Sequence, residues 1–356
     1  ENGIIKLPGV NYHSIVIPKT EHMPLKTLKR LIALQDMGAS VIFLGKPQTV
    51  PGFSNYQKRE QELKALTEKK INKIYSLKEL EIPLINAGVI KEEMSKVGLK
   101  FIRRKHLGEK IYYLVNHTPD KIEGLIPLSI QAKEVLILDP LTGKKGKAFT
   151  QQDGKITKVK LSLPSGTSIF LKTFDRVNSA KWKYYKRSKN SYKISGKWNF
   201  KVINGGPNND YSKKINRITS WSQWDEKMAT FSGTAQYEIK FNRPTKHKGP
   251  WLLKLGDVRE SAKVWLNDQY LGILWSNPYQ LTVDSLKNGK NTLRICVTNT
   301  GSNRIKAKEA RGEDWKIFYN INMVGLDYQL FDASKLDILD AGLLKEPILI
   351  PLKNSE

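Results

Sequence analysis

The strongest constraint on the fold of this chain is an alternation of apolar and polar residues towards its C-terminus. Every second residue of 262–266 is apolar, which predicts a strand with one buried face. Asn267-Asp268 interrupts the alternation with residues suited to a tight turn, and residues 270–275 predict the returning strand. With a further strand predicted at 280–283, short strands at this spacing indicate a β-sandwich. Its core is expected to contain the apolar face of this region: Ala262, Val264, Leu266, Leu293, Ile295 and Val297.

This region also resembles a known family. The segments LGDVRESAKVWLNDQYLG, W-x-NPY-x-L-x-V and LKNGKNTLRICVTNT resemble the galactose-binding-like jelly roll of many large glycoside hydrolases. Ser220-Trp221 and the FSGTAQY of residues 231–237 narrow the resemblance to glycoside hydrolase family 106, the α-L-rhamnosidase-like enzymes. The resemblance extends through most of the chain and is most specific in its last third. It implies a protein that works on carbohydrate.

The resemblance and the residue patterns together predict a multidomain protein, α/β followed by all-β. Residues 1–95 predict strands at 14–17 and 40–44 and helices at 24–37 and 55–70, an order typical of a small parallel sheet of Rossmann-like or flavodoxin-like type. No phosphate-binding glycine motif follows either strand. In family 106 a similar segment looks like a glutamine-amidotransferase domain. The single cysteine, Cys296, lies in another domain, so the nucleophile of that activity is absent.

The remaining domains are predicted to be β. Residues 96–175 predict an antiparallel β-domain, and its segments 156–163 and 167–174 are expected to form a hairpin across Pro164-Ser165-Gly166. Arg103-Arg104 stands where the resemblance leads us to expect His-Arg. We expect a basic linker at 176–197, the jelly roll at 198–353, and an aromatic loop at 311–328 folding over it.

The net charge is unusual, at +26, with a sequence pI of about 9.8. Such a charge fits a polyanionic partner, either nucleic acid or an acidic polysaccharide, or else a surface of solvated lysines. Lysine supplies 48 of the 60 basic residues, whereas phosphate and base recognition favours arginine. We therefore expect no specific nucleic-acid function.

The sequence offers little chemistry of its own. In family 106 the catalytic glutamates lie in a (β/α)₈ barrel that precedes the regions found here, together with a calcium site, so no catalytic residue transfers to this chain. A new carboxylate pair among Asp257, Glu260, Glu313 and Asp314 is disfavoured, because surface carboxylates are common. The five histidines show no metal-binding spacing. The resemblance allows a structural calcium in the jelly roll, although no spacing requires one.

Sugar binding is the remaining candidate function. Sugars present apolar C–H faces and hydroxyl edges, so a site needs an aromatic platform with polar partners. Three clusters in predicted loops or at strand ends meet this requirement: Trp221 with Trp224; Trp275 with Asn277 and Tyr279; and Asn299 with Asn303 and Arg304. We favour the structural alternative, in which Trp265 and Trp275 cover the sandwich as ordinary packing, Arg304 pairs with a carboxylate at the edge of the core, and the module supports a catalytic barrel.

The leading hypothesis is a non-catalytic accessory region of an α-L-rhamnosidase-like glycoside hydrolase, secreted or periplasmic, acting on complex polysaccharide. The chain begins with Glu1 and has no leader, so we expect it to be processed or cut from a longer chain that supplies an upstream barrel. No apolar run is long enough for a membrane span. The alternative is a stand-alone carbohydrate-binding protein or pseudoenzyme for acidic glycans. The length of the reading frame distinguishes the two.

Overall fold

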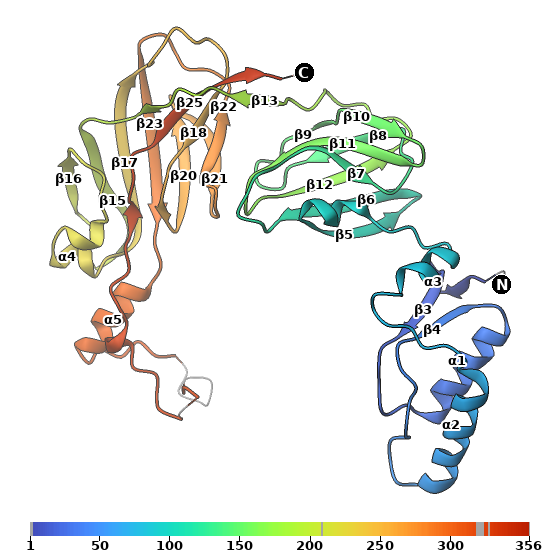
Figure 1. Ribbon diagram of the computed structural model, residues 1–356. Helices are drawn as coiled ribbons and strands as arrows, with labels where there is room; N and C mark the ends of the chain where they lie inside the picture. The colour runs from blue at the N-terminus through green and yellow to red at the C-terminus, as the bar shows by residue number, and fades with distance from the viewer. Residues whose placement is uncertain (1–2, 208, 318–323, 327, 356) are drawn as a thin grey trace. The chain divides into compact units, whose positions relative to one another are not determined.

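The computed structural model describes residues 3–207, 209–317, 324–326 and 328–355. The chain is mostly β-structure in several antiparallel sheets, with a few helices (Figure 1). It divides into two compact units, Glu1–Glu93 and Met94–Glu356. The first unit has one hydrophobic core among the described residues, and the second has two.

The first unit is built on a parallel strand pair with helices beside it. Strands β3 (Ser14–Ile17) and β4 (Ser40–Phe43) pair in parallel, which confirms the predicted strand-helix-strand order. Helix α1 (Leu25–Asp36) carries Leu28, Leu31 and Ile32 at helical spacing and buries them in the core. The unit's other elements are β1 (Ile5–Leu7), β2 (Val10–Tyr12), α2 (Tyr56–Lys70) and α3 (Glu81–Asn86).

The first half of the second unit, which runs from β5 to β12, contains two sheets that share one core; the rest of the unit is its second half. The larger sheet has the order β5 (Leu99–His106), β6 (Glu109–Asn116), β12 (Ser168–Phe174), β8 (Glu134–Leu138) and β9 (Lys145–Lys147). The smaller has the order β10 (Thr150–Asp153), β11 (Ile156–Leu163) and β7 (Ile122–Leu128). Buried residues of both sheets form this core.

The predicted hairpin of residues 156–163 and 167–174 is wrong. Both segments are strands, but β11 pairs with β10 and β7, whereas β12 pairs with β6 and β8 in the other sheet. Each strand buries alternate residues in the same core from opposite sides, so its sequence pattern fits either arrangement. The Pro164-Ser165-Gly166 connection therefore crosses between sheets, and Asn116 supports it by bonding to the Leu163 carbonyl.

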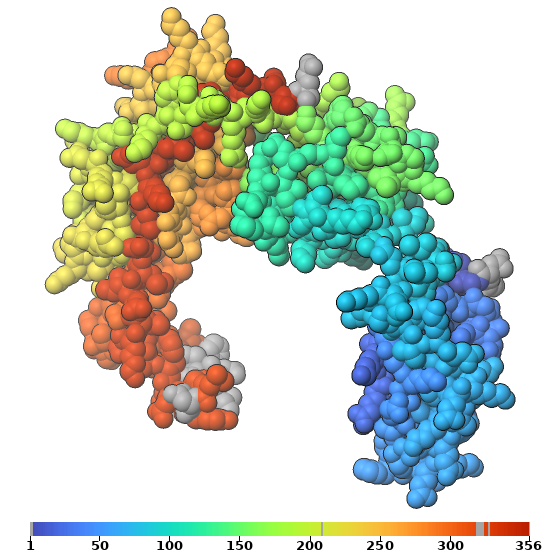
Figure 2. All heavy atoms as spheres, viewed as in Figure 1, coloured from blue at the N-terminus to red at the C-terminus, as the bar shows by residue number. Residues whose placement is uncertain are grey.

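The segment 176–197, expected to be a basic linker, is ordered by contacts with both halves of the unit. Trp182 and Tyr184 pack against the core of the first half. Strands β13 (Tyr185–Arg187) and β14 (Tyr192–Lys193) pair with β25 (Ile348–Asn354) of the second half. The segment, yellow-green in Figures 1 and 2, thus connects the two halves as ordered structure rather than as an unpaired linker.

The second half has two sheets around the largest core. A six-stranded sheet has the order β16 (Ser212–Ile215), β15 (Trp198–Gly206), β17 (Ser232–Asn242), β23 (Lys290–Thr298), β20 (Ser261–Leu266) and β21 (Gln269–Leu274). The other contains β13, β25, β18 (Trp251–Lys254) and β22 (Gln280–Val283), with β14 also paired to β25. The smaller elements are α4 (Glu226–Ala229), β19 (Val258–Arg259), α5 (Ser302–Ala310) and β24 (Gly342–Leu343).

The predicted apolar face of this half is confirmed. All six predicted core residues belong to the shared core, and none is more than 6% exposed. The turn between β20 and β21 places Asn267 and Asp268 at φ values of 50° and 66°, the left-handed region in which Asn and Asp are tolerated. Part of the expected aromatic loop, at 318–323 and 327, lies outside the described residues.

Candidate functional site

The second unit contains a cleft of about 860 Å³. Strands of the first half line it, together with the 180–187 segment, the 275–278 loop and β22 of the second half. The aromatic side chains in its lining are Tyr113, Trp182, Tyr184, Tyr185 and Trp275. Aromatic rings with intervening polar groups are the features that sugar sites need, so this cleft is the candidate site.

Backbone hydrogen bonds hold the 180–187 segment in place. The Lys147 amide donates to the Ala180 carbonyl and the Trp182 amide donates to the Lys147 carbonyl, both at 2.8 Å. The Tyr184 hydroxyl donates to the Lys160 carbonyl at 3.0 Å, and burial raises its pKa. On the other side, the Ser355 amide donates to the Tyr184 carbonyl at 2.9 Å. This wall of the cleft is therefore anchored to both halves of the unit.

The 275–278 loop presents the most exposed aromatic ring of the cleft. Leu274 is buried at the end of β21, and the next side chain, Trp275, is 66% exposed. At the far end of the loop, Tyr279 is buried, and its hydroxyl donates to the Glu260 carbonyl at 2.8 Å. A Cβ added to Gly166 would lie 3.2 Å from the Asn277 carbonyl oxygen, so the two loops approach closely. The loop is thus held at both ends by buried residues, and between them it presents a tryptophan that is open to solvent.

Of the predicted candidates, only Trp275 and Asn277 line the cleft. Tyr279 holds their loop in place instead. Trp221 is 0% exposed and lies in the core, where no sugar reaches it. Trp224 is half-buried against the same core, donates from Nε1 to Thr219 at 2.8 Å, and has the Lys213 ammonium 5.5 Å from its ring centroid.

The third predicted cluster holds backbone rather than an open site. The Asn299 side chain bonds to the Gly233 amide and the Phe231 carbonyl. Asn303 is buried and bonds twice to Leu339. The Arg304 guanidinium lies against Gly206, where an added Cβ would be 2.9 Å from Nη1.

The sequence patterns did not single out Tyr113, Trp182 and Tyr184. The signal that could have identified two of them is the KWKYYKR run of 181–187, in which aromatic and basic residues are interleaved. Tyr113 gives no such signal, because strand alternation alone assigns it to the face opposite the buried Tyr112.

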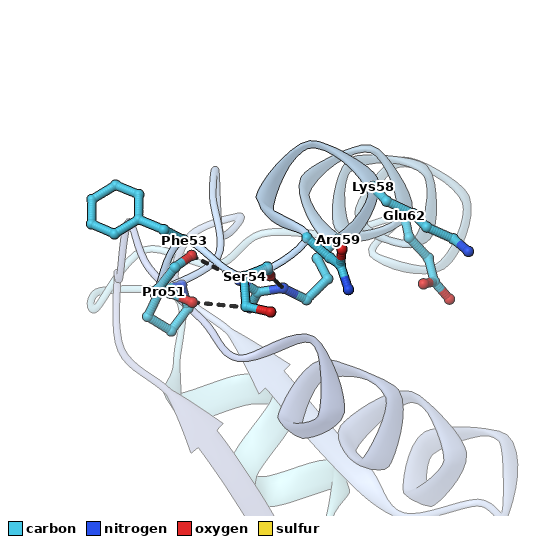
Figure 3. A pocket seen from close by; sticks show the side chains of 8 residues that line it. Pro51, Phe53, Ser54, Lys58, Arg59 and Glu62 are labelled. Carbon is cyan, nitrogen blue, oxygen red and sulfur yellow. Dashed lines mark hydrogen bonds between the residues drawn. The ribbon is translucent and has the colours of Figure 1, made fainter.

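A smaller hollow of about 480 Å³ lies in the first unit, beside the turn before α2 (Figure 3). Its Arg59 donates three hydrogen bonds to backbone carbonyls, those of Ser54, Pro51 and Gly52, at 2.7, 3.0 and 2.7 Å. These bonds commit the guanidinium to the turn. Phe53 is 96% exposed, and its ring points away from Arg59. The hollow therefore follows from the structure of the turn and offers no organised ligand site.

The described residues show neither a metal-binding group of side chains nor a helix suited to cross a membrane. Across the described ranges, no three His, Cys, Asp or Glu side chains come together as a metal-binding group, so the calcium that the resemblance allows finds no such cluster. Among the same residues, no helix combines the length and apolar character needed to cross a bilayer.

Comparison with known proteins identifies a shared fold. No protein-family model matches the chain. A curated protein of Formosa agariphila, named "Putative beta-glucuronidase", is 36% identical over 101 residues, which are 27% of this chain and 9% of that protein. The structure of a rhamnosidase from Novosphingobium sp. PP1Y matches 98% of this chain and 34% of its own, with a TM-score of 0.71 and 23% identity. The chain thus has the fold of about one third of that rhamnosidase's chain.

Proposed function

We propose that this chain is an accessory region of an α-L-rhamnosidase-like glycoside hydrolase of family 106, secreted or periplasmic, which acts on complex polysaccharide. In this proposal the first unit is the flavodoxin-like, amidotransferase-like segment without its chemistry, and the second half of the second unit is the galactose-binding-like jelly roll. The region supports a catalytic barrel, and its cleft binds carbohydrate. The likeness to the Novosphingobium rhamnosidase across 98% of this chain supports the first role.

The observation that carries the binding role is Trp275, a ring that is 66% exposed in a cleft lined by polar groups. An exposed indole offers an apolar face on which the C–H face of a sugar stacks. Asn277 follows two residues later; its side chain is exposed and makes no hydrogen bond to the described residues, so its amide is open to sugar hydroxyls. Tyr279, buried at the end of the loop, anchors it through the hydrogen bond of its hydroxyl to the Glu260 carbonyl.

Titration calorimetry of the complete chain with rhamnose-containing polysaccharide tests the binding role. Trp275→Ala is expected to abolish binding while leaving the melting temperature nearly unchanged, because the side chain is mostly solvent-exposed. The matched control is Tyr270→Ala, which removes an aromatic side chain that is 50% exposed on β21 and lies outside the cleft lining. Equal losses in both variants, or unchanged binding by Trp275→Ala, would contradict a site at the cleft.

A further inference from the structure

We infer that the cleft binds a negatively charged glycan, with its carboxylate or sulfate groups lying against four lysines: Lys144, Lys145, Lys181 and Lys183. This inference rests on the proposed carbohydrate role and adds the chemical class of the ligand. It assigns a ligand-binding role to part of the net charge of +26.

The charge of the cleft lining is strongly unbalanced. Its cationic residues are Lys121, Lys144, Lys145, Lys160, Lys181, Lys183 and Arg187. Its acidic residues are Glu123, Asp139 and Asp284. A concave surface lined by one sign of charge concentrates its field and raises the local concentration of the opposite sign. The lining therefore favours an anionic ligand over a neutral one.

The acidic residues of the lining do not neutralise the four lysines. Glu123 pairs with Lys121 at 2.5 Å. Asp139 accepts from the Leu141 amide at 2.9 Å and from the Thr142 hydroxyl at 2.6 Å, so it is committed to its own turn. None of the four lysines has a carboxylate within ion-pair distance in the part of the chain that the structure describes. Their ammonium groups remain available to a ligand.

Backbone pairing brings these four lysines together from distant parts of the chain. Lys147 on β9 forms a parallel bridge with Lys181, and the bonds of Lys147 to Ala180 and Trp182 extend it. An added Cβ at Gly146 would lie 2.7 Å from the Trp182 backbone, so no side chain separates the two strips. Trp182 packs against the core, whereas Lys181 and Lys183 on either side of it are exposed. The cluster is built by the fold.

The lining favours a glycan over a nucleic acid. Six of its seven cations are lysines, and Arg187, the remaining one, donates to Gln280 at 3.5 Å. Lysine binds separated anionic groups as a point charge, whereas phosphate and base recognition uses the bidentate fork of arginine. Trp275 is the one lining aromatic that is mostly exposed, whereas single-strand binders stack successive bases on several rings.

The experiment compares charged polymers with neutral counterparts of the same backbone. The complete chain is titrated at physiological salt with polygalacturonate and with its fully methyl-esterified form, then with dextran sulfate and with dextran. Single-stranded DNA is the fifth probe. We expect binding to one or both charged glycans and at least tenfold weaker binding to the neutral counterparts and to the DNA. The first pair tests carboxylate and the second tests sulfate.

Charge-matched variants locate the site. The double variant Lys181→Gln and Lys183→Gln is expected to weaken binding to the charged glycan at least roughly tenfold and to reduce its salt dependence. The control double variant, Lys201→Gln and Lys214→Gln, removes the same charge from exposed positions of β15 and β16 outside the cleft, and is expected to change binding less than about twofold.

The outcomes separate this inference from the proposed function. Equal binding to charged and neutral glycans, lost in Trp275→Ala, would overturn the inference and leave the carbohydrate role standing. No binding to any glycan would overturn both. Equal weakening by the two double variants would assign the effect to overall charge and overturn the lysine site. DNA binding as tight as glycan binding, with the same sensitivity to Lys181 and Lys183, would also overturn a glycan-specific cleft.

Discussion

The ring of Trp221 stacks on the ring of Tyr237, with 6.3 Å between centroids and 19° between planes. Both side chains are 0% exposed, and the Leu343 amide donates to the Tyr237 hydroxyl at 3.3 Å. Burial raises the pKa of that hydroxyl. The pair therefore joins η2 (Trp221–Gln223), β17 and β24 in the core of the C-terminal half.

Two tryptophans predicted as sugar platforms should now behave differently. Trp221→Ala is expected to lower the free energy of unfolding by about 3–5 kcal/mol, because it leaves a large cavity in the core. Trp275→Ala should lower it by less than about 0.5–1 kcal/mol, because the ring is 66% exposed. Denaturant unfolding followed by circular dichroism measures both values. Similar losses for the two variants would show that Trp275 also supports the core.

Gly342 gives a second stability prediction beside the same pair. Its φ is +91°, and an added Cβ would lie 2.3 Å from the Tyr237 hydroxyl and 2.5 Å from Trp221 Cε3. Gly342→Ala is expected to destabilise by about 2–4 kcal/mol, from left-handed backbone strain together with overpacking. Gly289→Ala is the control, since φ is +77° there but nothing lies within 4 Å, so about 1 kcal/mol of strain is expected. Equal melting temperatures for both variants would contradict the steric part.

Tyr211 predicts a change in stability at high pH. Burial, followed by the hydrogen bond from its hydroxyl to Asp225 Oδ2 at 2.6 Å, raises the pKa of Tyr211 to about 12. The unfolded side chain titrates at about 10. The stabilisation is therefore fully present below pH 10 and is lost as the pH rises through about 12. The free energy of unfolding should fall more steeply between these pH values for the native chain than for Tyr211→Phe, and parallel curves would contradict this.

The sequence predicted the local elements of this fold better than their pairing. The alternation in 262–266 has one apolar face, so burial alone selects its orientation and the residues of its core. The predicted pairing of β11 with β12 is wrong because the alternation of buried residues in each strand fits a partner strand on either side of the core. The sequence predicts a linker at 176–197 because its charge and short strands obscure any period, although long-range pairing with β25 orders the segment.

The candidate site was predicted only in part, for a related reason. Trp221 and Trp275 look alike in a sequence, and the difference between 0% and 66% exposure arises from contacts with distant residues such as Tyr237. The cleft itself joins Tyr113, the 180–187 segment and the 275–278 loop, which are separated by up to 165 positions in the numbering of the chain. No local sequence pattern predicts that these three segments lie together.

The 356-residue chain is expected to hydrolyse no aryl α-L-rhamnoside. The resemblance to family 106 covers no part of that family's catalytic barrel, and two of the four acidic residues considered instead form ion pairs: Asp257 with Arg259 at 3.0 Å, and Glu313 with Arg311 at 2.6 Å. Two carboxyl groups flanking one sugar bond are the usual requirement. Release of nitrophenol from the nitrophenyl substrate measures the activity. Turnover that survives purification and disappears in a single Asp or Glu variant would contradict the prediction.

The last prediction concerns the single buried face of the six-stranded sheet. Ile295 is 0% exposed and lies opposite Val264 and Tyr237 on the neighbouring strands. Ile295→Asp would bury a carboxylate without a partner and remove an aliphatic side chain whose burial is worth about 1.5–3 kcal/mol, so the C-terminal half should unfold. Lys263→Asp places the same residue on the exposed face of β20, and the half should stay folded. Near-ultraviolet circular dichroism, which reports the packed tryptophans, distinguishes the two. A folded Ile295→Asp variant would mean that the strand slips by one residue and exposes this face.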